Sequence, residues 1–439
     1  MKNKNLNRRQ FVGGLAAVVP LMAAFPQVVA AKTLGLGGAV APSNRINLGF
    51  VGLGKHGRGV NLWNLAGFSD CHVRALCDVD RRQIPLALET MKEVGAEAVS
   101  KKNITQDWRE VCSRSDVDAV VVSTPDHWHL PISMTAIRAG KDVICEKTSH
   151  TIKEGRDLVN TVDRYGAVFQ MAMEDRALPE YRRMAEVVRN GDIGKLQRIE
   201  ITIPTGTTSQ IALREDPIPD YVDWQMWLGP APEVPFQKER IMADYKDYIG
   251  WRTIRDYGGG LLTDWGVHLG DTALWAMDDW QDQSYSIVTN NEYLGEGLFD
   301  HAKINDVLYR FESGVEISIK SGGPSLRFIG SKGWVGNTGW RKPVESSYQE
   351  ILNKVYGASD LRLPVYVGEH RNFVNAVRSR GETMYSAEYY HRISTWLICG
   401  NLAGELNRKL YWNPSLEAFD NDDKANSLRS KPARNSWAR

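Results

Sequence analysis

The chain has 439 residues, of which 42% are hydrophobic, and its 54 Lys and Arg residues almost balance its 53 Asp and Glu residues, which leaves a formal charge of +1. This composition argues against a nucleic-acid-binding protein, which would carry a basic excess, and against a disordered chain, which would be poorer in apolar residues. The five cysteines are scattered and include no CxxC pair, so we expect neither a disulfide framework nor a cysteine metal site. The length suits two domains.

Residues 1–31 have the pattern of an export signal. Lys2 and Lys4 come first, the pair Arg8 and Arg9 stands before Phe11, and the segment is apolar and small from there to residue 31. This pattern indicates a signal peptide of the twin-arginine type, and hence a periplasmic or exported protein that leaves the membrane after cleavage. The alternative is an uncleaved anchor, although the apolar stretch is near the lower length limit for spanning a bilayer. Residues 32–44 are predicted to form a linker.

A glycine-rich turn follows the first predicted strand. The strand covers residues 46–52 and leads into Gly52, Gly54 and Gly57, which have the GxGxxG spacing. The first glycine permits a tight turn, the second lets the backbone approach a pyrophosphate, and the third allows close packing of the following helix. These residues therefore predict a dinucleotide site, and Arg58 is a further candidate within it.

An acidic residue ends the second predicted strand, over residues 73–78. Asp78 stands 21 positions after Gly57, close to the spacing at which a carboxylate binds the ribose hydroxyls of the adenosine. Its negative charge would oppose a 2'-phosphate, which favours NAD over NADP. Arg81 and Arg82 could offset that repulsion, so NADP remains an alternative.

Strands and helices alternate through the next ninety residues. Further strands are predicted at 119–123, 142–147 and 168–170, with helices at 80–94, 130–139 and 153–165. This alternation predicts an α/β Rossmann dinucleotide-binding domain over residues 45–170, with a parallel sheet. Ligands bind beyond the carboxyl ends of such strands, where the candidate residues are Thr124, Pro125, His127 and Glu146.

The pattern changes after residue 170. A helix is predicted at 179–190 and strands at 196–203, 285–293, 304–312, 315–320 and 326–329, followed by helices at 369–380 and 387–407. We therefore expect an α+β C-terminal domain with a large, mainly antiparallel sheet over residues 171–412, and a polar tail at 413–439. One face of this sheet is expected to be exposed or paired with another subunit, as in a homo-oligomer.

Several motifs together resemble the Gfo/Idh/MocA family of sugar and cyclitol oxidoreductases. They are GLGKHG at 52–57, CDVD at 77–80, STPDHWH at 123–129, CEKT at 145–148 and GGGLLTDWGVHLGD at 258–271. The resemblance implies that Lys147 is the reactive lysine and that Asp264 and His268 are its catalytic partners. Thr148 stands where the family has proline, so the turn that places Lys147 lacks the fixed φ of that residue.

The residues themselves are consistent with this chemistry. A helix is predicted at 261–277, and on it Asp264 and His268 are four residues apart and share one face. An imidazole or a desolvated lysine can accept the hydroxyl proton as hydride leaves the same carbon, and the carboxylate can orient the imidazole. The alternatives are that Lys147 is a surface lysine and that His268 is a core histidine. Asp271 is interpreted as a structural acid of the helix.

Substrate recognition is less well defined by the sequence. Candidate residues for binding sugar hydroxyls are Arg176, Tyr181, Trp251 and Arg252. One or two of the fourteen tryptophans are candidates to supply flat faces for sugar rings, although packing is the commoner role. The candidates near the site are Trp128, Trp224, Trp227, Trp251, Trp265 and Trp275. No metal site is expected, because His127 and His129 with Asp126 lack an identifiable further ligand.

The sequence thus predicts an exported, NAD-dependent oxidoreductase that acts on a secondary hydroxyl of a sugar, glycoside or cyclitol. One alternative is a glycoside hydrolase that oxidises the sugar transiently, eliminates the glycosidic bond and then reduces the sugar again. A second alternative is a non-catalytic sugar-binding protein that retains a bound dinucleotide.

Overall fold

The computed structural model describes residues 40–434 and residue 437. The predicted export signal lies outside the described residues. Residues 40–45 belong to an N-terminal unit in which one short turn, η3 (Pro42–Asn44), is described, and the chain from Ile46 onward forms a second unit. None of the described helices is long and apolar enough to cross a membrane.

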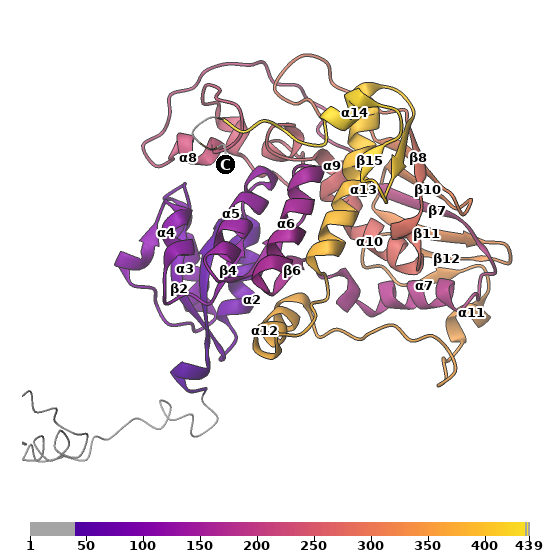
Figure 1. Cartoon of the computed structure of the whole chain (residues 1–439), viewed down its shortest axis with the longest axis horizontal. Coiled ribbons are helices and arrows are strands. Elements are labelled where there is room, and N and C mark those ends of the chain that lie inside the picture. The colour runs from indigo at the N-terminus through magenta and orange to yellow at the C-terminus, as the bar shows by residue number, and fades with distance from the viewer. Residues whose placement is uncertain (1–39, 435–436, 438–439) are drawn as a thin grey trace, which may run out of the picture. The chain divides into compact units, whose positions relative to one another are not determined.

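The first part of the second unit is a six-stranded sheet in which every neighbouring pair of strands is parallel (Figure 1). In spatial order its strands are β3 (Ile104–Thr105), β2 (Cys71–Cys77), β1 (Ile46–Val51), β4 (Ala119–Val122), β5 (Asp142–Glu146) and β6 (Phe169–Ala172). All residues of β4, β5 and β6 are buried, which explains their continuous apolar runs. The strand order reverses between β1 and β4, where an open α/β sheet offers its ligand crevice.

The crossovers of this sheet are short helices. They are η4 (Gly57–Leu62), α2 (Trp63–Ala66), α3 (Gln83–Glu93), η5 (Lys101–Asn103), α4 (Trp108–Ser113), α5 (Asp126–Arg138) and α6 (Ile152–Tyr165). Helix α6 shows how the sequence sets its bounds. The Thr151 side chain accepts a hydrogen bond from the Glu154 N–H at the start, and Gly166, with φ of 61°, ends the helix.

The second part is built on a nine-stranded sheet. In spatial order its strands are β13 (Glu345–Ser346), β12 (Trp334–Asn337), β11 (Ser325–Gly330), β7 (Leu196–Ile203), β10 (Glu316–Ser321), β9 (Asp306–Phe311), β8 (Tyr285–Thr289), β14 (Leu410–Asn413) and β15 (Ala418–Phe419). Only the β7–β10 pair among these strands is parallel. The expected Rossmann domain and mainly antiparallel second domain are therefore confirmed.

The helices of the second part are α7 (Pro179–Arg189), α8 (Trp224–Leu228), α9 (Gly260–Asp264), α10 (Gly266–Ala276), α11 (Gln349–Asn353), α12 (Glu369–Ser379), α13 (Ala387–Leu406) and α14 (Asp423–Ser427), and its 3-10 turns are η6 (Asp175–Ala177), η7 (Lys238–Ile241), η8 (Trp251–Thr253) and η9 (Trp280–Asp282). Helix α10 packs on β7 and β11, and α13 packs on both α6 and α10. Helix α13 thereby joins the parallel sheet's helix layer to the second sheet (Figure 1).

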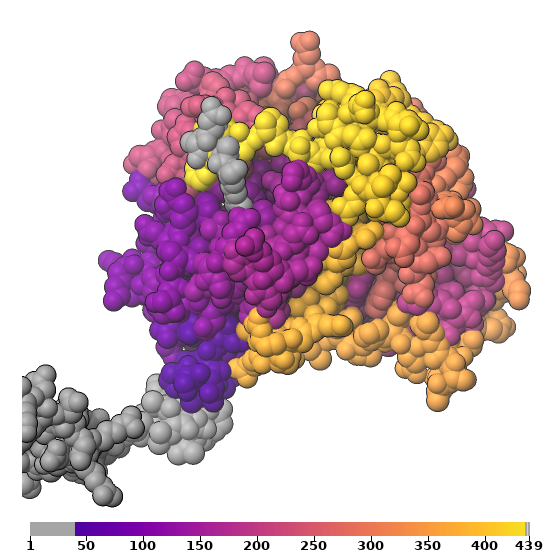
Figure 2. Space-filling model, viewed as in Figure 1, coloured from indigo at the N-terminus to yellow at the C-terminus, as the bar shows by residue number. Residues whose placement is uncertain are grey.

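Two predicted elements differ from the structure. The helix expected at 261–277 is broken at Trp265 into α9 and α10, so Asp264 and His268 lie on different helices. The tail expected at 413–439 also contains regular secondary structure, because it adds β15 to the sheet and includes α14. Beyond α14, the Arg429 carbonyl accepts from the Lys153 N–H, and the Arg434 N–H donates to the Pro230 carbonyl. The yellow segment that crosses the upper surface in Figure 2 is this part of the chain.

Candidate active site

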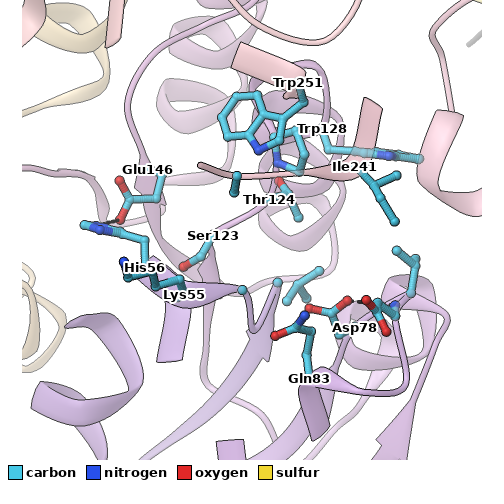
Figure 3. Close-up of a pocket in the computed structure, with 18 of the residues that line it drawn as sticks. Lys55, His56, Asp78, Gln83, Ser123, Thr124, Trp128, Glu146, Ile241 and Trp251 are labelled. Atoms are coloured by element: carbon cyan, nitrogen blue, oxygen red, sulfur yellow. Dashed lines mark hydrogen bonds and ion pairs between the residues drawn. The ribbon is translucent and has the colours of Figure 1, made fainter. Parts of the chain in front are cut away.

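One large cavity, of about 760 Å³, opens at the carboxyl ends of the parallel strands and is closed on its other side by residues of the second part. The glycine turn after β1 forms one wall, together with Asp78, Thr124 and Pro125. Figure 3 shows Asp78 and Gln83 on one side of this space and Glu146 with His56 on another. The cavity therefore lies where the reversal of strand order predicts a ligand.

The three glycines of the turn have distinct surroundings. Gly52 has φ of 89°, and a side chain there would collide with the Ser123 carbonyl. A Cβ on Gly57 would lie 2.4 Å from the Gly52 oxygen, so this glycine permits close packing of the helix on the turn. A Cβ on Gly54 would meet no atom within 4 Å, and Gly54 lines the cavity. Only Gly54 therefore leaves open space where a pyrophosphate can approach the backbone.

Asp78 and its neighbours fit the adenosine end of a dinucleotide. The carboxylate accepts hydrogen bonds from the Leu53 N–H at 2.7 Å and the Asp80 N–H at 2.8 Å, which leaves further lone pairs for ribose hydroxyls. Burial raises the pKa of Asp78 to about 6 in spite of these hydrogen bonds. The hydroxyl of Thr124, in the same wall, is buried without a hydrogen-bond partner among the described residues. These residues fit an adenine dinucleotide.

The Glu146 carboxylate is held beside the glycine turn. It accepts from the Asn61 side chain at 2.7 Å and pairs with the His56 ring at 3.0 Å. Burial alone would raise its pKa, but His56 and Asn61 outweigh that effect and lower the pKa of Glu146 to about 2. Behind Asn61, the His370 ring donates to the Asn61 side-chain oxygen at 2.7 Å. His56, which sequence reasoning did not single out, thus connects the turn to β5.

Lys147 follows β5 directly and contacts Asp264. Its Nζ donates to the Asp264 carboxylate at 2.5 Å and to the Asp264 carbonyl at 2.8 Å. Burial lowers the pKa of Lys147, but the carboxylate has the larger combined effect and raises it. Burial likewise opposes ionisation of Asp264, yet Lys147 and Arg252 bring its pKa well below the usual range. The two groups therefore form an ion pair. The Lys147–Thr148 peptide bond is cis.

His268 has a different carboxylate partner from the one expected. Its Nδ1 donates to Asp175 at 2.7 Å, and Trp340 Nε1 donates to the other oxygen of Asp175 at 3.3 Å. Burial lowers the pKa of His268, but Asp175 outweighs burial and raises it. The expectation that Asp264 orients the imidazole is thus not what the structure shows. The break at Trp265 turns Asp264 toward Lys147 and leaves the imidazole to Asp175.

Aromatic rings surround this end of the cavity. The Trp265 and Trp340 rings lie 6.0 and 5.7 Å from the His268 ring, measured between centroids. Of the tryptophans considered as sugar platforms, four line the cavity: Trp128, Trp227, Trp251 and Trp265. Trp224 and Trp275 are not among the lining residues. The cavity end therefore combines an ion pair, an imidazole and flat apolar surfaces.

Other predicted site residues divide into two groups. Arg58, Trp251 and Arg252 line the cavity, as do Gly52, Gly54, Gly57, Asp78, Thr124, Pro125, Glu146, Lys147, Asp264 and His268. Arg176, Tyr181 and His127 do not. Arg176 is buried against Asp271 at 2.8 Å, and Tyr181 accepts from the Arg341 N–H at 3.0 Å. Both residues thus have partners within the protein and lie outside the lining of the cavity.

His127 is also structural. Its two ring nitrogens lie 3.3 Å from the Tyr257 carbonyl and 3.1 Å from the Trp227 carbonyl, so it connects α5 to α8 and to the turn at Tyr257 in the second part. Burial lowers the pKa of His127 to about 4.

One group of potential metal ligands lies at the cavity end. Glu174, Asp175 and His268 bring ligand atoms within 4.8 Å of one another. Their hydrogen bonds already account for the arrangement, because Glu174 pairs with Arg341 at 2.5 Å and Asp175 binds His268 and Trp340.

Comparison with known families identifies the class of protein. Residues 46–173 match the family model described as "Oxidoreductase family, NAD-binding Rossmann fold", and residues 181–439 match "Oxidoreductase family, C-terminal alpha/beta domain". The chain belongs to the Gfo/Idh/MocA oxidoreductase family.

Individual relatives are distant. A glycosyl hydrolase family 109 protein of Shewanella pealeana is 25% identical over 203 residues, 44% of each chain, and the 1,5-anhydro-D-fructose reductase of Ensifer adhaerens is 26% identical over 264 residues, 58% of this chain and 67% of the reductase. The chain covers less than half of the length of the first curated relatives that it matches. The crystal structure of GenD2 from gentamicin A biosynthesis, in complex with NAD, has the same fold with a TM-score of 0.60 at 19% identity, over 85% of this chain and 98% of GenD2.

The contrast between Gly54 and Gly57 leads to a first prediction. Gly54→Val places a side chain in the open part of the cavity, so we expect NAD affinity to fall at least about tenfold while the melting temperature changes little. Gly57→Ala is the matched control: its Cβ meets backbone, so we expect melting to drop by about 5 °C or more. Calorimetric titration with NAD and thermal unfolding of both variants measure the two effects. Unchanged NAD affinity in Gly54→Val would contradict this placement of the pyrophosphate.

Proposed function

We propose that the protein is an NAD-dependent oxidoreductase that transfers hydride between the nicotinamide and a secondary hydroxyl of a sugar, glycoside or cyclitol. The observation that carries this proposal is the single cavity that holds the glycine turn together with Lys147, Asp264 and His268. Two relatives with sugar-directed names support the substrate class: the 1,5-anhydro-D-fructose reductase and a levoglucosan dehydrogenase of Pseudarthrobacter phenanthrenivorans.

In this proposal the bound dinucleotide supplies the hydride acceptor, and the protein's own residues handle the proton. Lys147 stays an ammonium because of Asp264, so it donates a hydrogen bond to the substrate oxygen and stabilises negative charge that develops there. His268 accepts the hydroxyl proton, because an imidazole titrates closer to neutral pH than an ion-paired lysine. Asp175 holds His268 by Nδ1, which leaves Nε2 as the nitrogen for the substrate.

The surroundings of the adenosine end support NAD over NADP. Arg82 pairs with Asp80 at 2.7 Å and stacks on Tyr221 at 3.7 Å, and Arg81 donates to the Asp220 carbonyl. Both arginines that could offset the charge of Asp78 already have a carboxylate or carbonyl partner. A 2'-phosphate would meet the Asp78 carboxylate and would compete with Asp80 for Arg82, which lines the cavity.

A second candidate function is glycoside hydrolysis through transient oxidation. The match to glycosyl hydrolase family 109 proteins, including that of Shewanella pealeana, favours it. In the hydrolase, the same Lys147, Asp264 and His268 would serve both the oxidation and the later reduction. The two functions therefore differ in whether a glycosidic bond breaks after the oxidation.

A product assay separates the two functions. The full chain is incubated with NAD and aryl glycosides of several sugars, and the absorbance of NADH and the released phenol are followed together. For the dehydrogenase we expect NADH and a keto-glycoside with an intact glycosidic bond; for the hydrolase we expect steady phenol release without net NADH. If neither signal appears with any sugar or cyclitol, including free sugars, the proposed redox function is wrong.

A further inference from the structure

Arg252 is a buried cation whose hydrogen bonds are incomplete. It comes from η8, lines the cavity, and its side chain is 11% exposed. Its Nη2 donates to the Tyr245 hydroxyl at 2.9 Å. Its Nε and one Nη atom have no hydrogen-bond partner among residues 40–434 and 437. Buried N–H groups without acceptors are costly and rare, so this guanidinium keeps donors for which the described part of the protein supplies no hydrogen-bond acceptor.

Neighbouring carboxylates do not fill that role. Asp264 comes within 3.5 Å of Arg252 Nε, but the same carboxylate oxygen receives the 2.5 Å hydrogen bond from Lys147. Asp126, which also influences Arg252, accepts from the Gly259 N–H at 3.1 Å. Two cations, Lys147 and Arg252, therefore share Asp264, and Lys147 has the closer contact.

The position of the guanidinium is set by aromatic rings. It lies 4.2 Å from the Trp251 ring centroid and 4.4 Å from that of Tyr245. Such stacking holds the planar group without using its N–H donors in the plane. A planar fork of N–H groups matches the oxygens of a carboxylate or a phosphate, to which Arg binds more specifically than Lys.

We infer that Arg252 binds an oxyanion of the substrate, so that the sugar which the protein oxidises carries a carboxylate or a phosphate. This inference rests on the proposed function, since it assigns the substrate's acidic group to the same cavity. Arg252 and Lys147 both contact Asp264, which places the oxyanion beside the residues that handle the reacting hydroxyl. A carboxylate and a phosphate would use the same N–H donors, and binding measurements distinguish them.

The test compares acidic sugars with their neutral counterparts. The full chain, saturated with NAD, is titrated calorimetrically with glucose, glucuronate and glucose 6-phosphate, and with galactose and galacturonate. We expect at least one acidic sugar to bind about 10- to 100-fold more tightly than its neutral counterpart, as charged hydrogen bonds allow. The tighter of glucuronate and glucose 6-phosphate identifies the oxyanion. Equal affinities within every pair would overturn the inference.

Variants assign the preference to Arg252. Arg252→Met is expected to abolish the preference for acidic sugars, because it weakens their binding much more than the binding of neutral sugars. Arg252→Lys keeps the charge without the fork, so it should retain part of the preference. Arg240→Met is the matched control, because Arg240 is buried on η7, bonds to Tyr257 and does not line the cavity. If Arg252→Met is too unstable to titrate, Arg252→Lys decides: an unchanged preference overturns the inference.

The outcomes also separate this inference from the proposed function. An acidic sugar that binds through Arg252 but never reduces NAD would sustain the oxyanion site and refute the redox function. A neutral sugar that is bound and oxidised as well as the corresponding acidic sugar would sustain the redox function and refute the oxyanion site. If Arg252→Met weakens the binding of NAD and of sugars alike, Arg252 serves the cofactor. If it weakens the binding of acidic and neutral sugars equally, Arg252 serves Asp264. Either result overturns the inference.

Discussion

Lys147→Met is expected to lower kcat for sugar oxidation by about 100- to 1000-fold, the range found when one donor to a developing oxyanion is removed. The physical reason is the position of Nζ, which Asp264 holds as an ammonium at the edge of the cavity. Methionine fills a similar volume but can neither donate a hydrogen bond nor carry charge. We expect the loss in kcat because charge on the substrate oxygen develops only as the reaction proceeds. Steady-state kinetics with the sugar that the wild type oxidises measure it.

A matched control is available on α6. Lys153→Met makes the same substitution at an exposed lysine, which pairs with Asp157 at 3.2 Å outside the cavity, and we expect wild-type kinetics from it. Melting temperatures of both variants show whether a loss reflects unfolding, because Lys147→Met removes the closer of the two cations that pair with Asp264 and leaves Arg252 at 3.5 Å. Retention of more than a tenth of wild-type kcat by a folded Lys147→Met protein would show that Lys147 is not part of the chemistry.

Much of the parallel sheet could be predicted from the sequence because its physical signals are local. Strands β4 and β5 are buried on both faces, so their apolar runs are continuous and easily recognised. The glycine spacing specifies the turn at Gly52 and Gly57, where backbone and neighbouring atoms leave no room for a side chain. Strands β12 to β15 escaped prediction, since they have two to four residues and depend on pairing with distant partners.

The pairing of each carboxylate with Lys147 or His268 could not be predicted, because it depends on contacts between residues that are distant in the sequence. A spacing of four residues predicts that Asp264 and His268 share a face, but the helix breaks between them. The partner of His268, Asp175, is 93 residues earlier, and Trp340 lies on a loop after β12. One signal for Asp175 was present: it follows the last parallel strand, β6, at the same edge of the sheet as Thr124 and Glu146.

Arg176 was predicted to bind substrate, but it is not among the residues that line the cavity. Its position close after β6 made it a reasonable substrate-binding candidate, yet its guanidinium packs 4.2 Å from the Tyr389 ring and pairs with Asp271. These partners come from α13 and α10, far along the chain. A buried arginine must be paired, and only the tertiary structure shows whether protein or substrate supplies the partner.

The second large effect is expected in the pH dependence. Oxidation should follow an ascending limb as pH rises, because His268 can accept the hydroxyl proton only when its imidazole is neutral. Burial alone would lower the pKa of His268, but Asp175 raises it above its usual value. Asp175→Asn removes the negative charge and keeps a side chain of the same shape, so the pKa of His268 falls and the limb moves to lower pH.

Single-turnover reduction of bound NAD, recorded across pH, isolates the proton-coupled step from product release. Asp157→Asn makes the same change at an exposed carboxylate on α6 and is expected to leave the limb in place.

Trp340→Phe removes one hydrogen bond to Asp175 without changing the charge. The less stabilised carboxylate then holds the imidazolium more strongly, so the limb should shift less than in Asp175→Asn and in the opposite direction. His268→Gln should abolish the limb together with most of the rate. A limb that keeps its midpoint in Asp175→Asn, or persists in His268→Gln, would assign the proton to another group and leave His268 as a packing residue between Trp265 and Trp340.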